Sequence, residues 1–226
     1  MNILVACEES QAVTKELRRL GHTAYSCDVQ DPSGGRPDWH IKGDVSVFLN
    51  PGKDYYFRGN DFFKFNNVYG YTVAIPRKWD MIIGFPPCTY LSHAAAGRHS
   101  LKHNSLEYIN ERTLKRVEAA AFFMEIATAD CEHIAIENPL GIMNTVYRKP
   151  DQIINPYDFG DNVAKRTCIW LKNLPPLLPT YKKPPEVKQW VENVKGDGAS
   201  RQKERSKTFP GVAQAMAEQW TNNFFL

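Results

Sequence analysis

Two residues of this chain have the side-chain types needed for covalent chemistry on a flat heterocycle. Cys88 follows two prolines in "GFPPCTYLS", directly after the apolar run "WDMIIG". Glu137 follows a second apolar run, in "IAIENP". A thiolate can add to one ring carbon while a carboxyl group stabilises the negative charge that develops on the ring. Because prolines fix φ and favour extended backbone before them, "FPPC" predicts a stiff exit that holds the sulfur at a sheet edge.

Each of these residues also has an ordinary structural alternative. A glutamate after a strand can be a salt-bridge partner or a helix cap. Most unpaired cysteines are small buried hydrophobes, and we expect this of Cys7, Cys27, Cys131 and Cys168. The five cysteines form no CxxC pair and the six histidines have no metal-ligand spacing, so we expect no disulfide framework, no metal and a reducing compartment. A catalytic role is favoured over these structural roles only because Cys88 and Glu137 occur together.

Alternating strand and helix patterns would position this pair. Short apolar runs predict buried strands at 2–7, 22–28, 79–85 and 133–137, and helical periodicity predicts helices at 10–21, 105–130 and 209–225. Repeated β-α-β units predict a doubly wound, mostly parallel α/β sheet, whose ligands bind at the carboxyl ends of the strands. The side chains expected there are Glu8, Asp28, Asp44, Cys88 and Glu137.

Two predicted helices carry further expectations. For the helix at 10–21 we expect Ser10 as the N-cap and Gly21 as the stop. The helix at 105–130 should bury one apolar side, made of Leu106, Ile109, Val117, Ala120, Ala121 and Met124.

Residues 50–77 form an unusual aromatic segment, broken by turn signals, that predicts a β-hairpin insertion. Its aromatic residues, interleaved with Lys and Arg, have two interpretations. They stack on single-stranded nucleic acid, or they pack on the sheet or on a second subunit. The Lys- and Pro-rich segment 171–207 is mostly loop.

Length and composition limit the class of protein. With 226 residues, 42% hydrophobic and 23% charged, we expect a single folded domain over 1–226. The net charge of +3 permits a polyanionic partner without proving one. No apolar run has the length of a membrane span, and "MNILVACEES" lacks signal-peptide features, so we expect no membrane partner and a cytoplasmic location.

Several of these motifs resemble those of the cytosine-C5 DNA methyltransferases. "DMIIGFPPCTYLS" resembles the Pro-Cys motif, "IENP" the Glu-Asn-Val motif, and "FPGVAQAMAEQW" the closing segment of that family. Over nearly its full length the chain resembles small phage- and prophage-borne proteins of this kind, with "PPCTYL", "IENP", "KPDQII" and "KERS" in the same order. The resemblance therefore implies a phage- or prophage-encoded protein of a bacterial host cell.

The resemblance implies a Rossmann-like fold that binds S-adenosylmethionine, and a role for each matching residue. Cys88 would attack C6 of cytosine, and Glu137, protonated, would hydrogen-bond N3. The implied cofactor contacts are Ala6, Glu8, Ser10, Asp28, Asp44, Pro86 and Gly211. The implied substrate contacts are Pro87, Ser92, Asn138, Lys165 and Arg166, although Lys165 and Arg166 also suit surface salt bridges.

Three departures from the family pattern keep alternatives open. "ACEESQ" has no glycine where the cofactor loop needs them, Thr89 replaces a glutamine, and 171–207 is a reduced recognition region. The substrate therefore stays open among duplex DNA, single-stranded DNA and a cytosine nucleotide. Other open alternatives are a catalytically silent accessory protein that binds nucleic acid or a nucleotide, and a nucleotide-level pyrimidine C5 modification with another one-carbon donor. A homodimer is also open.

Overall fold

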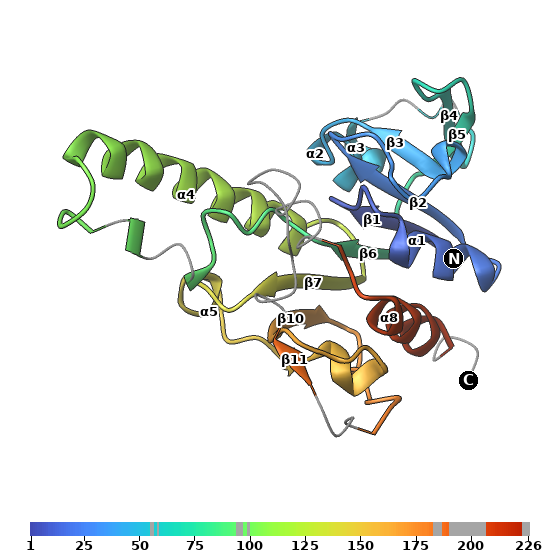
Figure 1. Ribbon diagram of the computed structural model, residues 1–226. Helices are drawn as coiled ribbons and strands as arrows, with labels where there is room; N and C mark the ends of the chain where they lie inside the picture. The colour runs from blue at the N-terminus through green and yellow to red at the C-terminus, as the bar shows by residue number, and fades with distance from the viewer. Residues whose placement is uncertain are drawn as a thin grey trace.

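A seven-stranded sheet forms the centre of the molecule (Figure 1). The computed structural model describes residues 1–54, 57, 59–93, 97–98, 100–182, 187–189 and 207–222. The strands of the sheet are β1 (Asn2–Ala6), β2 (Thr23–Asp28), β3 (His40–Lys42), β6 (Met81–Gly84), β7 (His133–Pro139), β8 (Gln152–Ile154) and β10 (Thr167–Lys172). Their spatial order is β3-β2-β1-β6-β7-β10-β8.

Most neighbouring strands of this sheet run parallel. The pairs β1–β2, β2–β3, β1–β6 and β6–β7 are parallel, and β10 is antiparallel to both β7 and β8. The expected mixed α/β fold with a mostly parallel sheet is confirmed. β6 is buried along its whole length, as a parallel strand must be when both faces of its sheet are covered.

Helices cover both faces of the sheet. The α-helices are α1 (Ala12–Arg19), α2 (Ser46–Leu49), α3 (Pro51–Asp54), α4 (Leu106–Ala127), α5 (Met143–Val146) and α8 (Pro210–Asn222), and the 3₁₀ helices are η1 (Pro37–Trp39) and η3 (Pro156–Phe159). α1 and α8 share one hydrophobic cluster with one face of the strands, and α4 belongs to the cluster on the other face. Alternate residues of each strand therefore belong to different halves of the core.

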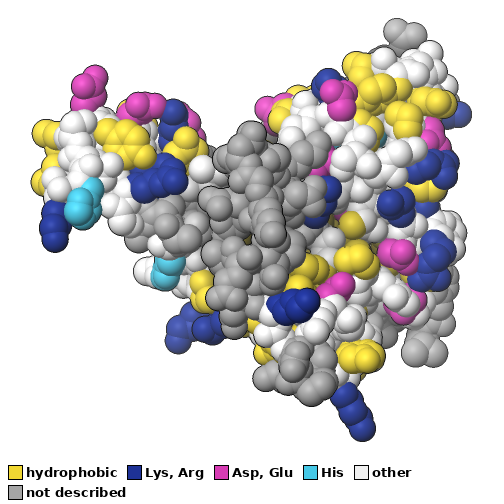
Figure 2. Space-filling model, viewed as in Figure 1, with side chains coloured by type: hydrophobic (Ala, Val, Ile, Leu, Met, Phe, Trp, Pro, Cys, Tyr) yellow, Lys and Arg dark blue, Asp and Glu magenta, His cyan; other side chains and the backbone are white. Residues whose placement is uncertain are grey.

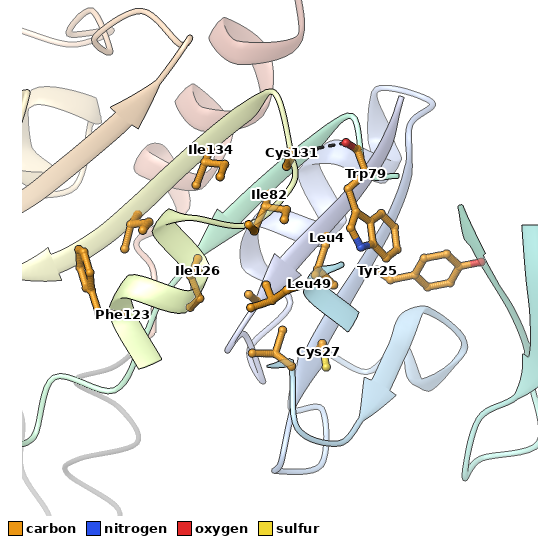
Figure 3. Close-up of a cluster of buried hydrophobic side chains, with 14 of the residues drawn as sticks. Leu4, Tyr25, Cys27, Leu49, Trp79, Ile82, Phe123, Ile126, Cys131 and Ile134 are labelled. Carbon is orange, nitrogen blue, oxygen red and sulfur yellow. Dashed lines mark hydrogen bonds between the residues drawn. The ribbon is translucent and has the colours of Figure 1, made fainter. Parts of the chain in front are cut away.

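The half of the core beneath α4 is shown in Figure 3. Phe123 and Ile126 of α4 pack there on Ile82 and Ile134 of the sheet. The thiol of Cys131 donates a hydrogen bond to the carbonyl oxygen of Trp79 at 3.2 Å. Cys27, Cys131 and Cys168 are buried, as the sequence predicted, whereas Cys7 is only partly buried.

Only the C-terminal half of α4 packs on the sheet, and its N-terminal half projects away from it (Figure 1). The helix begins where predicted, because the Ser105 side chain accepts a hydrogen bond from the Tyr108 N–H at 3.2 Å. The predicted apolar side is wrong for Leu106 and Val117, which are 62% and 63% exposed, and for Ala121, which is also exposed. In the N-terminal half the buried residue is Arg112.

Inside segment 50–77, β4 (Phe62–Asn66) and β5 (Thr72–Pro76) form an antiparallel pair. Phe57 is buried and Phe65 packs against the core, which favours the packing interpretation for these rings. Phe62 and Tyr71 are exposed. The stacking interpretation also rests on Tyr55, Tyr56 and Arg58, which lie outside the described residues.

A third, two-stranded sheet joins β9 (Val163–Ala164) and β11 (Lys188–Gln189) in parallel. β11 lies in the segment 171–207, much of which is outside the described residues, so the reduced recognition region stays a prediction. None of the helices described is long and apolar enough to cross a membrane.

Candidate active site

The direction in which the chain adds strands reverses between β1 and β6. From β1 the chain proceeds outward to β2 and β3 on one side, whereas β6 and β7 lie on the other side. In doubly wound sheets, ligands bind outside the carboxyl ends of the strands at this reversal of order. The segments that flank it are residues 7–11, after β1, and residues 85–93, after β6.

Cys88 lies on a tight turn beyond β6 and is exposed to solvent. The N–H groups of Leu91 and Ser92 donate hydrogen bonds to its carbonyl oxygen at 3.1 and 3.0 Å, which closes the turn. Pro86 is buried in the exit from the strand, and Pro87 is exposed. An exposed thiol on a fixed turn is not the small buried hydrophobe that was the structural alternative for Cys88.

The segment that carries Cys88 is joined to the segment that follows Glu137. The Asn138 side-chain amide donates to the Pro86 carbonyl oxygen at 2.7 Å. Farther along, Ser92 and Gly141 form an antiparallel bridge, in which the Ile142 N–H donates to the Leu91 carbonyl oxygen at 2.9 Å. Asn138 and Ser92, both expected to contact substrate, thus hold the two segments together.

Gly141 permits this close approach. A Cβ atom at this position would collide with the Leu91 carbonyl oxygen and lie 3.0 Å from the Cα of Ser92. Both contacts are with backbone, which cannot move aside as a flexible side chain can. The glycine is therefore required by the junction of the two segments.

Glu137 lies inside β7 rather than after it, next to the residue that pairs with the end of β6, and it lines a pocket on the α8 side of the sheet. The residues that line this pocket are Glu137, Ile154, Pro156, Lys165, Thr167, Lys207, Thr208, Phe209 and Val212. Burial raises the pKa of the Glu137 carboxyl, whereas the charge of Lys165 and a hydrogen bond with Thr167 act to lower it. The net shift favours the protonated, hydrogen-bond-donating form.

Lys165 and Glu137 are thus brought together, although they are distant in sequence. Lys165 also lies 5.8 Å from the centroid of the Phe209 ring. Arg166, the other basic residue expected to contact substrate, is exposed. The pocket has a volume of only about 20 Å³, room for one water molecule. None of the residues that line it belongs to the Cys88 segment, residues 85–93.

The glycine-free loop after β1 adopts left-handed backbone at two residues. Cys7 has φ 60° and Gln11 has φ 57°, values that non-glycine residues rarely adopt. The Gln11 side chain donates to Ser26 Oγ at 3.2 Å and to the Arg36 carbonyl oxygen at 2.8 Å, which holds the strained loop in place. The loop conformation that glycine usually provides is therefore obtained here without it.

Glu8 caps α1 from inside this loop. Its carboxylate accepts hydrogen bonds from the Val13 N–H at 2.6 Å, and from the Thr14 N–H and hydroxyl at 3.2 and 2.6 Å. The expectation that Ser10 is the N-cap is wrong, because the N-cap is Gln11 and the capping bonds go to Glu8. These bonds assign Glu8 to the helix N-terminus rather than to a cofactor.

We expect Glu8→Gln to flatten the pH dependence of stability. Burial raises the pKa of Glu8 from 4.5 to about 7, against hydrogen bonds from Thr14 and Val13. Between these values the folded protein holds a proton that the unfolded chain releases, so the free energy of unfolding falls as pH rises, by about 1.4 kcal/mol per pH unit. Urea unfolding across this pH range measures the slope. The control is Glu16→Gln on α1, which should keep the wild-type slope; equal slopes in all three proteins would contradict the assignment.

Acidic residues gather near the carboxyl ends of β1, β2 and β3. Asp28 accepts a hydrogen bond from the Gln30 N–H at 2.9 Å, and Asp44 accepts one from the Ser46 N–H at 3.0 Å, so both carboxylates are held by turns. Burial raises the pKa of Asp28, and the charge of buried Glu9 adds to this. This set suits the hydroxyl, amine and cationic groups of S-adenosylmethionine.

Ala6 and Gly211, the remaining predicted cofactor residues, make contacts within the protein. Ala6 is fully buried at the end of β1. The Gly211 N–H donates to Asp161 Oδ2 at 3.0 Å, and a Cβ at Gly211 would collide with the Phe159 carbonyl oxygen. Within the described residues, no group of three or more His, Cys, Asp or Glu side chains could hold a metal ion.

Sequence reasoning missed two arginines of α4 that hold the Cys88 turn. Arg112 donates to the Thr89 carbonyl oxygen at 3.1 Å, and Arg116 to the Tyr90 carbonyl oxygen at 3.2 Å. Their spacing was the available signal, because Arg112 and Arg116 continue, at helical intervals, the buried stripe of Phe123 and Ile126. Charged side chains on the buried side of a helix need hydrogen-bond partners inside the protein.

Comparison with known proteins gives little beyond the fold. No family model matches the chain, and no curated protein matches it. Among solved structures it is similar to a prophage-encoded protein of E. coli whose assignment as a DNA modification methyltransferase is provisional, with a TM-score of 0.43 and 13% identity. The match covers 76% of this chain and 46% of the other, so the chain spans about half the length of that protein. A similarity this low carries no statement about activity.

Proposed function

We propose that this protein transfers a methyl group from S-adenosylmethionine to C5 of cytosine in DNA, through a covalent bond between Cys88 and C6 of the ring. The observation that carries the proposal is the junction between the Cys88 segment and the segment after Glu137. It joins the segment that carries the exposed Cys88 thiol to the strand that carries Glu137, whose carboxyl has a raised pKa.

The proposed reaction needs both side chains. The Cys88 thiolate attacks C6, the C5–C6 π electrons move into the ring, and protonated Glu137 stabilises the developing charge by donating to N3. C5 becomes nucleophilic and takes the methyl group. A base then removes the C5 proton, and the S–C6 bond breaks as the double bond re-forms, which releases the thiol.

Residues of the β1–β3 edge would hold the cofactor. Asp28 would accept hydrogen bonds from the ribose hydroxyls, Asp44 would face the adenine amine, and the charge of Glu9 would attract the cationic methionine end. The bound cofactor supplies an electrophilic methyl group. Glu8 has no part in this arrangement, because its carboxylate caps α1.

A flipped or single-stranded base suits this site better than a stacked one. A ring buried in a duplex cannot reach a thiol at a sheet edge, so the target nucleotide must leave the stack.

Mass spectrometry of nucleic acid tests the function. DNA and nucleotide pools are compared from cells that express the wild-type protein or Cys88→Ala. We expect 5-methylcytosine in DNA with the wild-type protein and only background with the variant. Methylcytosine confined to the nucleotide pool would move the substrate to the nucleotide level. If neither DNA nor nucleotides change, while calorimetry still detects an oligonucleotide ligand, the protein is a silent binder.

A further inference from the structure

Arg112 and Arg116 lie one turn apart on α4 and reach the same short segment. Arg112 is 6% exposed, donates to the Thr89 carbonyl oxygen, and places its guanidinium 4.8 Å from the centroid of the Tyr90 ring. Arg116, which is partly exposed, donates to the next carbonyl oxygen, that of Tyr90. Both cations are therefore fixed directly beside the turn that carries Cys88.

This cation pair has no anionic partner in the part of the chain that the structure describes. The ion pairs there include neither arginine, and the nearby Glu111 pairs with Lys115 instead. The Nε atom of Arg112 is buried and makes no hydrogen bond. Burial lowers the pKa of Arg116, and the charge of Arg112 lowers it further, as expected of two cations held together without an anion. A buried, unsatisfied cationic donor is costly unless a ligand completes it.

We propose that Arg112 and Arg116 form a binding site for a backbone phosphate of the nucleic-acid strand that presents its base to Cys88. Guanidinium groups bind phosphate through paired N–H donors, and each arginine uses only one donor in its bond to the turn. Because the same groups hold the Thr89 and Tyr90 carbonyls, a phosphate bound there would fix the strand relative to the thiol. In Figure 2, Lys and Arg side chains appear on the projecting part of α4 among hydrophobic and acidic ones. The inference depends on the proposed function only in taking a polynucleotide as the ligand.

The salt dependence of binding tests this site. Fluorescence anisotropy measures the affinity for a short labelled single-stranded DNA over a series of salt concentrations, with wild-type protein, Arg116→Gln and Arg112→Gln. Each phosphate contact to a single strand contributes about 0.7 to the slope of log affinity against log salt concentration. We expect each variant to lose about that much slope, and to bind about tenfold more weakly at low salt.

The matched control is Lys115→Gln, which makes the same charge change on the same turn of α4 but removes a side chain that pairs with Glu111. It should keep the wild-type slope. Since Arg112 is buried, its variant is first checked by thermal unfolding, and the partly exposed Arg116 carries the test if that variant is unfolded.

The outcomes separate this site from the proposed function, because binding needs neither cofactor nor turnover. If the Arg116→Gln slope equals that of Lys115→Gln, or if the wild-type protein does not bind the strand, the site is overturned even when methyl transfer occurs. A loss of slope supports the site even if no methyl transfer is found. Competition by deoxycytidine monophosphate identifies which phosphate is bound. If Arg116→Gln weakens binding of the mononucleotide as much as binding of the strand, the phosphate belongs to the target nucleotide itself. If Arg116→Gln weakens binding of the strand alone, the phosphate belongs to a neighbouring nucleotide.

Discussion

Replacing Glu137 with glutamine is expected to lower the rate of methyl transfer by about 10²–10⁴-fold, the usual contribution of a positioned general acid. Glutamine has nearly the same shape, so the pocket formed with Lys165 and Thr167 should remain. It cannot give up a proton to N3 as the charge develops. Single-turnover kinetics with labelled S-adenosylmethionine measures the rate of the chemical step.

The pH profile of the wild-type enzyme adds an independent signature. Because burial raises the pKa of Glu137 and the protonated form is the donor, the rate of the chemical step should fall as pH rises through that pKa. Glu137→Gln should lack this limb. The control is Glu132→Gln, an exposed residue just before β7, which should keep the wild-type rate and profile. A wild-type rate in Glu137→Gln would remove Glu137 from the mechanism.

Substitution of Gly141 by alanine is expected to reduce methyl transfer at least as much as a lost hydrogen-bond donor, about 10²-fold or more. The added Cβ would meet the Leu91 carbonyl and the Ser92 Cα, so the two segments must separate. Cys88 is on one of these segments and Glu137 precedes the other. The structure predicts a loss of kcat larger than the loss of thermal stability, which calorimetry measures on the same sample.

Gly97 provides the matched control for this substitution. It follows the Cys88 turn in the sequence, and a Cβ there would meet no atom within 4 Å. Gly97→Ala should therefore leave both rate and stability unchanged. Equal activity of the Gly141 and Gly97 variants would show that the junction does not set the position of the thiol.

The central strands β1, β2, β6 and β7 could be predicted from sequence because the apolar runs that form them are local features. "MIIG" and "IAI" are short apolar runs, which is what a parallel strand covered on both faces requires. Whatever follows such a run lies at the carboxyl edge, which places Cys88 beyond β6, whereas β7 continues past its apolar run and includes Glu137. The Pro-Pro-Cys exit likewise reflects a backbone restriction of proline itself.

The partners of individual side chains could not be predicted, because they come from distant parts of the fold. The position of Glu8 after the first strand predicted a contact with the cofactor, but its carboxylate accepts hydrogen bonds at the N-terminus of α1. The apolar side of α4 was misplaced because the N-terminal half of that helix leaves the sheet, which periodicity cannot reveal. Gly141 carries no local signal of its collision with Leu91, fifty residues earlier in the chain.

Covalent trapping tests the central claim most directly. Cytosine with fluorine at C5 has no C5 proton to remove, so the bond between sulfur and C6 cannot break after methyl transfer. The protein is incubated with S-adenosylmethionine and 5-fluorocytosine, supplied in DNA and as a mononucleotide, then digested and examined by mass spectrometry. We predict a stable adduct on the peptide that contains Cys88, and none with Cys88→Ala. No adduct with either substrate, or an adduct on another cysteine, would contradict the proposed chemistry.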